Sequence, residues 1–283
     1  MYDVLIIGSG PAGLSAAIYA KRANLSVLVV GKDGGALEKA EKIDNYLGLE
    51  KILSGPELLE IGIKQAATLG AEVIKAEVLG VEWTGNYAID TTVGRFEGKA
   101  LIFAMGNSRK KPNVKGIEDF EGRGVSYCAV CDAFFFRGKD VAVLGSGNYA
   151  FHEAEYLKNV AGRVTLLTNG ENNGEISSFE VIDTKISHLE GADRIESIVF
   201  EDGNKLSIDG LFVAQGFAGA SELANKLGVM CENGNIIADQ NGYTNLPGCF
   251  AAGDCIGGIL QVSTAVGEGA KAALSAIKYI RSK

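Results

Sequence analysis

Two cysteines and an acid lie together in one short stretch, Cys128-Ala129-Val130-Cys131-Asp132. A Cys-x-x-Cys pair can close a small disulfide, and the thiolate of one cysteine is stabilised by the other. Such a pair is a reversible store for two electrons. The stretch therefore predicts a redox-active disulfide bond. The question for the rest of the chain is which donor reduces this disulfide and which acceptor oxidises the dithiol.

The remaining cysteines, Cys231, Cys249 and Cys255, make the total odd. An odd number in a long chain of intracellular character argues against a structural disulfide framework and for at most one working pair. A zinc site built from Cys128, Cys131 and two other cysteines is the alternative. No second Cys-x-x-Cys and no nearby histidine supply the usual ligand spacing, so we expect no metal.

Composition limits the class of protein further. The 283 residues suffice for two domains, and 47% hydrophobic with 22% charged residues is typical of a soluble globular enzyme. No apolar run reaches the roughly 18 residues that span a bilayer, and Met1 leads directly into the strand-like segment 3–7 without a signal peptide. The net charge of −8 argues against nucleic acid. We expect a cytoplasmic protein with neither a membrane nor a nucleic acid partner.

An internal repeat sets the architecture. The segment from Asp3 through the glycine turn at 8–13 recurs from Asp140 through the turn at 145–150, with an offset of 140 − 3 = 137 residues. Each copy reads as strand, glycine turn, helix and strand, the order of a dinucleotide-binding fold. Such glycines let the backbone approach a pyrophosphate, which the helix N-terminus attracts. The alternative is that one or both turns are merely structural.

The elements between and after the two copies complete the prediction. We expect helices at 55–69, 177–189 and 263–280, and strands at 72–81, 87–90, 95–96, 100–106, 195–200, 205–208, 211–214 and 249–252. These predict an α/β protein of two Rossmann-like domains, each a three-layer ββα dinucleotide-binding fold, with the second domain inserted in the first. The first domain would comprise residues 1–114 and 246–283, and the inserted dithiol domain residues 115–245.

Several motifs follow one another in the order of a known family. They are Gly8-Ser9-Gly10-Pro11-Ala12-Gly13, Gly34-Gly35-Ala36-Leu37, Asp44-Asn45-Tyr46, Ser54-Gly55-Pro56, the run from Gly122 to Asp132, Ala251-Ala252-Gly253-Asp254 and Gln261-Val262. With these motifs the chain resembles the low-molecular-weight thioredoxin reductases over nearly its whole length.

The resemblance implies that the first domain binds FAD. By this resemblance, the pyrophosphate would lie on Gly8, Gly10, Pro11, Ala12 and Gly13. The nucleotide and the ring would be lined by Lys32, Gly34, Gly35, Ala36, Leu37 and Asn45. The ribitol would contact Gly253 and Asp254, and the isoalloxazine would lie beside Gln261 and Val262. A carboxylate such as Asp254 suits a polyol because it accepts two hydrogen bonds. Standing alone, Asp254 would read as a helix cap or turn residue.

The resemblance also assigns roles to the dithiol stretch. Cys131 would take electrons from reduced FAD, Cys128 would attack thioredoxin, and Asp132 would donate and accept the accompanying proton. An exposed turn residue is the alternative for Asp132. Members of the family are homodimers. Because the dithiol must meet both the flavin and thioredoxin, we expect the inserted domain to rotate about linkers at 112–116 and 243–247.

The sequence departs from the family where NADPH would bind. Family members carry a His-Arg-Arg segment and a further arginine after the second Rossmann strand, whereas this chain continues with residues 168–173, Thr-Asn-Gly-Glu-Asn-Asn. A 2′-phosphate carries about two negative charges and normally requires guanidinium groups. Glu171 also lies late for an acid that would bond the ribose of NAD. Leu260 replaces a family arginine before Gln261.

A flavin and a dithiol without a hydride donor need another source of electrons. The chain therefore resembles most closely the ferredoxin-dependent flavin thioredoxin reductases. Residues 109–139 carry seven Lys and Arg against four Asp and Glu, a local excess of 7 − 4 = 3 positive charges that could steer an acidic ferredoxin. The alternatives are an NADPH- or NADH-dependent reductase with a divergent pocket, a flavin-dependent disulfide oxidase, and a flavoprotein redox sensor without enzymatic activity.

Overall fold

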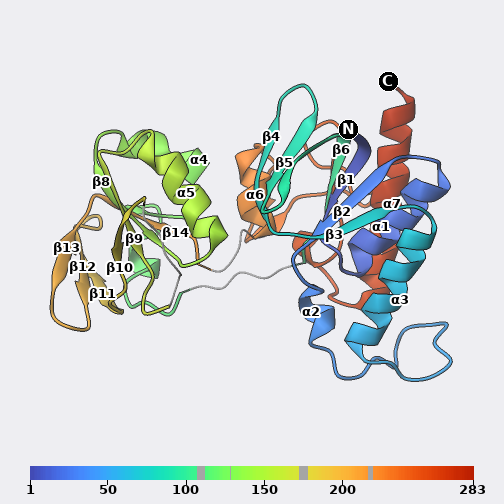
Figure 1. The fold of residues 1–283 in the computed structure, drawn as a ribbon, viewed down its shortest axis with the longest axis horizontal. Helices are drawn as coiled ribbons and strands as arrows, with labels where there is room; N and C mark the ends of the chain where they lie inside the picture. The colour runs from blue at the N-terminus through green and yellow to red at the C-terminus, as the bar shows by residue number, and fades with distance from the viewer. Residues whose placement is uncertain (107–111, 128, 172–177, 216–218) are drawn as a thin grey trace. The chain divides into compact units, whose positions relative to one another are not determined.

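The computed structural model describes residues 1–106, 112–127, 129–171, 178–215 and 219–283. The chain divides into two compact units: unit 1 comprises Met1–Ser108 and Gly219–Lys283, and unit 2 comprises Arg109–Ala218. Each unit is built on a parallel β-sheet that carries helices, which confirms the predicted α/β class (Figure 1).

The sheet of unit 1 has a parallel core with β1 near its centre. In spatial order its parallel strands are β3 (Glu72–Lys75), β2 (Val27–Gly31), β1 (Tyr2–Ile7), the C-terminal half of β6 (Gly94–Phe103) and β17 (Cys249–Ala251). Strand β2 is buried throughout, and the last four residues of β1 are buried as well. Unbroken apolar strands of this kind require cover on both faces of the sheet.

Three helices lie side by side on one face of this sheet: α1 (Pro11–Arg22), α3 (Gly55–Thr68) and α7 (Val262–Arg281) (Figure 1). The contact between α1 and α7 is made by small residues; a Cβ placed on Gly269 would lie only 2.0 Å from the carbonyl oxygen of Ala12. Alanines of both helices are fully buried there. This close approach fixes the N-terminus of α1 against the C-terminal helix of the chain.

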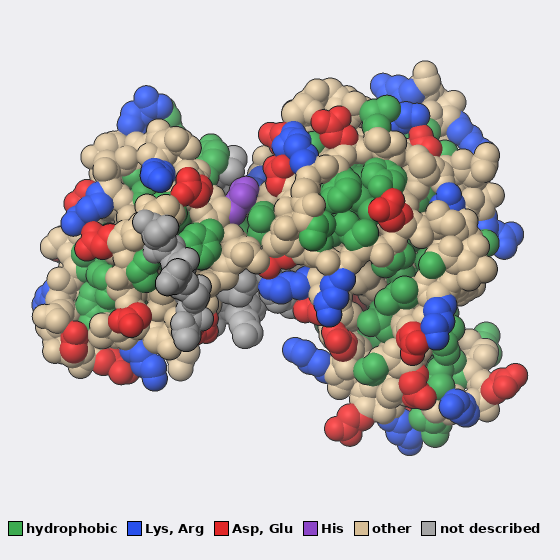
Figure 2. Space-filling view, in the orientation of Figure 1, with side chains coloured by type: hydrophobic (Ala, Val, Ile, Leu, Met, Phe, Trp, Pro, Cys, Tyr) green, Lys and Arg blue, Asp and Glu red, His purple; other side chains and the backbone are tan. Residues whose placement is uncertain are grey.

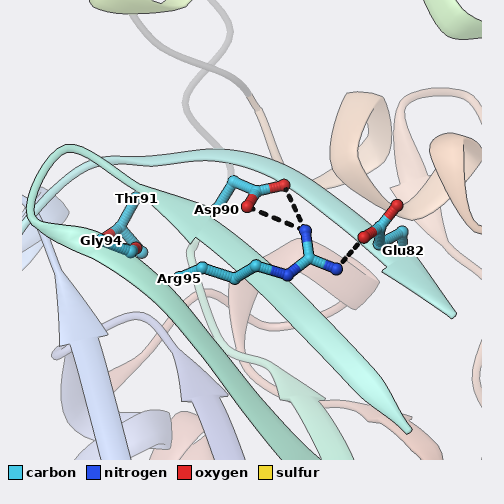
Figure 3. Close-up of polar contacts among 5 residues, drawn as sticks. All are labelled: Glu82, Asp90, Thr91, Gly94 and Arg95. Atoms are coloured by element: carbon cyan, nitrogen blue, oxygen red, sulfur yellow. Dashed lines mark hydrogen bonds and ion pairs between the residues drawn. The ribbon is translucent and has the colours of Figure 1, made fainter. Parts of the chain in front are cut away.

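An antiparallel meander continues the sheet through β4 (Val78–Trp83), β5 (Tyr87–Thr91) and the N-terminal half of β6. Figure 3 shows the guanidinium of Arg95 between two acids of neighbouring strands. It donates to both carboxylate oxygens of Asp90, at 3.0 and 3.2 Å, and to Glu82. Exposed pairs of this kind contribute about 0.2–1 kcal/mol each, so the buried strands dominate the stability of the meander.

Unit 2 holds a second parallel sheet, in the order β10 (Glu180–Ile182), β9 (Arg163–Leu167), β8 (Asp140–Leu144), β14 (Gly210–Val213) and β7 (Val125–Ser126). An antiparallel sheet of β11 (Ile186–Glu190), β12 (Ser197–Phe200) and β13 (Lys205–Ser207) accompanies it, and helix α5 (Asn148–Lys158) joins β8 to β9. The order β8, α5, β9 is the second copy of the repeat, as the sequence predicts.

The predicted helix at 177–189 is wrong, because the described part of this segment forms strands β10 and β11. Strand β10 runs parallel to β9, and β11 pairs with β12. The β-branched side chains of Val181, Ile182 and Ile186 favour strands, and Ile186 and Leu189 are buried. Pairing with β9 and β12 therefore makes the described part of this segment β-structure.

The inserted unit ends earlier than residue 245, the predicted boundary. Residues 219–245 belong to unit 1, where α6 (Ala220–Lys226) packs on β4 and Lys226 donates to the carbonyl oxygen of Leu79 at 3.3 Å. The short hairpin of β15 (Cys231–Glu232) and β16 (Asn235–Ile236) follows.

Neither predicted linker coincides with a boundary between the units. Tyr243 pairs with Phe250 inside unit 1, so residues 243–247 are not a linker, and residues 112–116 belong to unit 2. The chain passes between the units next to 107–111 and 216–218, which lie outside the described residues.

Among the described residues, five further segments form helices of three or four residues. They are α2 (Gly35–Glu38), η1 (Glu118–Phe120), α4 (Ala129–Asp132), η2 (Ala133–Phe136) and η3 (Asp254–Ile256). Over the described ranges, no helix combines the length and apolar character needed to cross a membrane. The same residues contain no group of three or more His, Cys, Asp and Glu side chains that could hold a metal ion.

Candidate functional site

The first glycine turn leaves the N-terminus of α1 uncapped. Its N-cap is Gly10, no side chain of the described residues bonds there, and no acid lies in the first turn. Helix α3 of the same unit differs, since Ser54 and Glu57 close a capping box at its start. Free N–H groups and the positive end of a helix dipole form an anion site. The turn therefore offers uncapped N–H groups at the place where the sequence predicts a phosphate.

The glycines of this turn serve two purposes. A Cβ on Gly13 would lie 1.9 Å from the carbonyl oxygen of Gly8, and Gly8 itself has a φ of +116°, which side chains rarely adopt. Both glycines are required for the close packing of helix on strand. A Cβ on Gly10 would meet no atom within 4 Å, so this glycine faces open space. A dinucleotide cradle needs such a close but open backbone, and the turn fits one.

Strand β2 ends at Gly31, and Lys32 follows directly at the same edge of the sheet. The Lys32 ammonium pairs with Glu77 at 3.1 Å. The Glu77 side chain is only 8% exposed, and its Oε1 has no hydrogen-bond partner among the described residues. The sequence prediction named Lys32 and missed Glu77, because no local pattern connects positions 45 residues apart. This ion pair occupies the position where Rossmann folds usually hold a ribose.

The loop that follows is held by its own acids. The N–H of Gly34 donates to Glu38 at 2.9 Å, and the N–H of Gly35 donates to Asp33 at 2.9 Å. Gly35 adopts a φ of +60°. Leu37 points into the core while Ala36 is exposed. These bonds give the predicted cofactor loop after β2 a defined conformation.

Two predicted flavin residues meet although 216 positions separate them. The side-chain amide of Asn45 donates to Oε1 of Gln261 at 2.9 Å. Gln261 is the N-cap of α7, where its N–H donates to the hydroxyl of Thr264, and Val262 is the first residue of the helix. The contact joins the loop after α2 to the start of the last helix.

Asp254 is the first residue of η3, and Ala252 and Gly253 separate it from the buried strand β17. Gly253 before it has a φ of +78°, and its N–H donates to Glu268 of α7 at 2.9 Å. Partial burial raises the pKa of Asp254. Glu268 was not predicted, since its spacing to Gly253 marks no known motif. Because β1, β2 and β17 are parallel, the residues that follow them all lie at the carboxyl edge of one sheet.

The dithiol stretch belongs to unit 2. Cys128 lies outside the described residues, and Cys131 is placed as part of the short helix α4. The Asp132 carboxylate accepts a hydrogen bond of 2.7 Å from the hydroxyl of Ser126, a buried residue at the end of β7. This bond fixes the direction of the Asp132 carboxylate. Ser126 was not predicted as a site residue, although it lies within the family motif from Gly122 to Asp132.

The second glycine turn is occupied by an acid. The hydroxyl of Ser146 donates to the carboxylate of Glu171, which comes from the loop after β9. That loop turns sharply, because Asn169 and Gly170 both have positive φ, 55° and 82°. A Cβ on Gly170 would lie 3.1 Å from Cε of Lys185, so this exposed lysine lies along the loop. Glu171 brings negative charge to the turn that would hold the phosphates of a nucleotide.

Two further cysteines are inert by burial. Cys249 is 0% exposed and Cys255 is 1% exposed, and burial raises the pKa of each thiol to about 12. Below about pH 8.5, the ordinary pKa of a thiol, both are protonated in the folded and unfolded states. As pH rises from there toward 12, only the unfolded chain ionises, so their contribution to stability is lost.

We therefore expect iodoacetamide to label neither Cys249 nor Cys255 in the native protein at neutral pH. We also expect the free energy of unfolding to fall above about pH 8.5. Mass spectrometry after native labelling, and urea titrations across alkaline pH, check the two statements. Native labelling of Cys255 as fast as that of an unfolded chain would contradict the assigned burial. Labelling after urea unfolding is the control.

Comparison with known proteins gives one family over almost the whole chain. The pattern of the pyridine nucleotide-disulphide oxidoreductases matches residues 2–269. The thioredoxin reductase of Aquifex aeolicus is 36% identical over an alignment of 311 residues, which covers 100% of this chain and 94% of that protein. The thioredoxin reductase of Listeria innocua is 34% identical and covers 99% and 94%.

Two solved structures share the fold over their full length. The atypical thioredoxin reductase TRi from Desulfovibrio vulgaris Hildenborough has a TM-score of 0.95 and 41% identity, covering 100% of this chain and 99% of that chain. A ferredoxin-flavin thioredoxin reductase from Clostridium acetobutylicum has a TM-score of 0.74 and 34% identity, with the same coverage. The similarity therefore extends across both units.

Proposed function

Because the chain belongs to the pyridine nucleotide-disulphide oxidoreductase family, as a thioredoxin reductase that uses FAD, we propose that ferredoxin rather than NADPH supplies its electrons. One observation carries the choice of donor: the carboxylate of Glu171 is bonded to Ser146 of the second glycine turn. Residues 168–177 contain no Lys or Arg. A 2′-phosphate and a pyrophosphate would meet repulsion there instead of guanidinium groups.

Unit 1 holds the residues that we assign to FAD. The uncapped N-terminus of α1 would receive the pyrophosphate, Asp254 the ribitol, and the Asn45–Gln261 pair would border the ring. When bound, FAD supplies the chemistry that links single-electron donors to a two-electron dithiol.

The dithiol carries the exchange with thioredoxin. Two electrons and two protons convert the Cys128–Cys131 disulfide to a dithiol, so two one-electron ferredoxins serve each turnover. The Cys128 thiolate then attacks the thioredoxin disulfide and forms a mixed disulfide. Cys131 attacks the Cys128 sulfur, which restores the internal disulfide and releases thioredoxin as a dithiol. Asp132, oriented by Ser126, holds and returns a proton beside the pair.

Features near the dithiol support protein partners. Phe134 and Phe135 belong to η2, which follows α4, and are 72% and 67% exposed. The guanidinium of Arg137 lies 5.7 Å from the centre of the Phe134 ring, and Lys115 and Arg123 are exposed on the same unit. Figure 2 shows acidic and basic side chains interspersed over the visible face, so steering of ferredoxin would rest on a local basic group. We also propose that the enzyme works as a homodimer.

A steady-state assay tests this proposal. The holoenzyme is supplied anaerobically with reduced ferredoxin, NADPH or NADH in turn, and the thiols formed on thioredoxin are counted. We expect turnover with ferredoxin alone. If NADPH supports turnover instead, Lys185 is the cation beside the loop, and Lys185→Ala should then abolish it. Hydrogen peroxide formed from a dithiol and oxygen would identify a disulfide oxidase.

A further inference from the structure

Helix α5 carries a buried acid that the roles above leave unexplained. Glu153 is 2% exposed and lies on the same face of the helix as Ala150, Ala154 and Leu157, which are all fully buried. Removing a carboxylate from water costs several kcal/mol unless hydrogen bonds compensate it. An acid at the centre of an apolar face therefore has a specific partner.

The partner is the backbone of the dithiol stretch. Oε2 of Glu153 accepts a hydrogen bond of 2.9 Å from the N–H of Ala129, which is itself fully buried. Ala129 is the first residue of α4 and follows Cys128 directly. On its other side, Oε1 of Glu153 lies 3.5 Å from Nδ1 of His152. The acid thus connects the second glycine helix to the first residue of the dithiol helix.

Helix α4 depends on such external bonds. It has only four residues, too few for a helix to be stable by itself. Its last residue, Asp132, is held by Ser126 of β7, and its first residue is held by Glu153 of α5. Both anchors belong to unit 2. The segment that contains Cys131 is therefore attached to α5 at its first residue and to β7 at its last residue.

We propose that Glu153 is a positioning residue for the dithiol, which it holds through the Ala129 N–H. In a dinucleotide site, the helix after the glycine turn serves the nucleotide; here it anchors the redox centre. The proposal rests on the dithiol function proposed above, but not on the identity of the electron donor.

The test compares three variants of the holoenzyme. Glu153→Leu introduces an apolar side chain of similar volume beside Ala150 and Leu157 and removes the acceptor of the Ala129 N–H. Glu153→Gln retains an amide oxygen that can accept this N–H. Glu155→Ala is the matched control, because Glu155 lies on the same helix, is exposed and pairs with Lys158 at 3.7 Å. The enzyme is reduced with dithiothreitol, and iodoacetamide labelling of Cys128 and Cys131 is followed by mass spectrometry.

We expect Cys128 to react faster than Cys131 in the natural protein. Glu153→Leu should reduce the ratio of the two rates about tenfold, the effect of one buried N–H left without its acceptor. Glu153→Gln should restore the ratio, and Glu155→Ala should leave it unchanged. In thioredoxin reduction, Glu153→Leu should have a lower kcat and an unchanged KM for thioredoxin. Glu153→Gln and Glu155→Ala should keep both constants.

Two outcomes would overturn the proposal. One is a Cys128-to-Cys131 labelling ratio in Glu153→Leu that equals the ratio in Glu155→Ala. Glu153 would then contribute only to core packing. The other is a Glu153→Gln variant as impaired as Glu153→Leu. Should Glu153→Leu not fold, hydrogen exchange of the Ala129 amide decides: protection in Glu153→Gln supports the anchor, and rapid exchange in the natural protein contradicts it. The labelling ratio and the hydrogen exchange need neither ferredoxin nor a nucleotide, so a failed ferredoxin assay would leave both tests valid.

Discussion

Replacement of Cys131 by serine should reduce thioredoxin turnover by on the order of 10³-fold or more, because removing one member of a unit that acts together removes nearly all of its catalysis. The variant can still use Cys128 to attack thioredoxin. Without Cys131, however, nothing resolves the mixed disulfide. We expect a covalent complex of enzyme and thioredoxin, visible on a non-reducing gel and released by dithiothreitol.

Two controls separate this result from general damage. Cys128→Ser should be equally inactive but form no complex, since the exported nucleophile is lost. Cys231→Ser should retain activity, because this thiol lies in unit 1, half-buried beside the carbonyl oxygen of Val229. A complex formed by Cys128→Ser and not by Cys131→Ser would reverse the assigned roles.

The second large effect concerns Asp132. Asp132→Asn should reduce thioredoxin turnover by about 10²-fold, the lower end of what a general acid–base group contributes. The amide retains an oxygen that accepts the Ser126 hydroxyl, so the local fold should persist. Rapid mixing of reduced enzyme with thioredoxin measures the step directly.

Ser126→Ala provides the graded comparison, because it removes the bond of 2.7 Å and leaves the carboxylate. We expect a smaller loss of turnover than in Asp132→Asn, since the carboxylate stays in place but loses the donor that orients it. If Asp132→Asn kept full turnover, Asp132 would be the exposed turn residue that is the alternative to a catalytic acid.

Local patterns in the sequence were sufficient for the sheet core and the glycine turns. Strand β1, the turn at Gly8 to Gly13 and helix α1 follow from apolar runs and glycine spacing, which depend on neighbouring residues alone. The second copy at β8 and α5 follows in the same way. The family resemblance placed Asn45 and Gln261 near the same cofactor, which local spacing could not do. The two side chains are hydrogen-bonded to each other.

The residues that the sequence did not reveal act through distant partners. Glu153 bonds an N–H 24 positions away, and Glu77 pairs with a lysine 45 positions away. Glu153 had one local signal, an acid in the apolar spacing of Ala150, Ala154 and Leu157. The end of the inserted unit was missed because α6 joins unit 1 through tertiary packing on β4, which no composition change marks.

The most direct test of the proposed electron path is the response of the flavin band to each donor. The FAD-loaded enzyme is mixed anaerobically with NADPH, NADH or reduced ferredoxin, and its visible absorbance is recorded. With Glu171 bonded into the second glycine turn, we expect the band to persist with both nucleotides and to bleach with ferredoxin. Immediate bleaching by NADPH, with none by ferredoxin, would contradict the account.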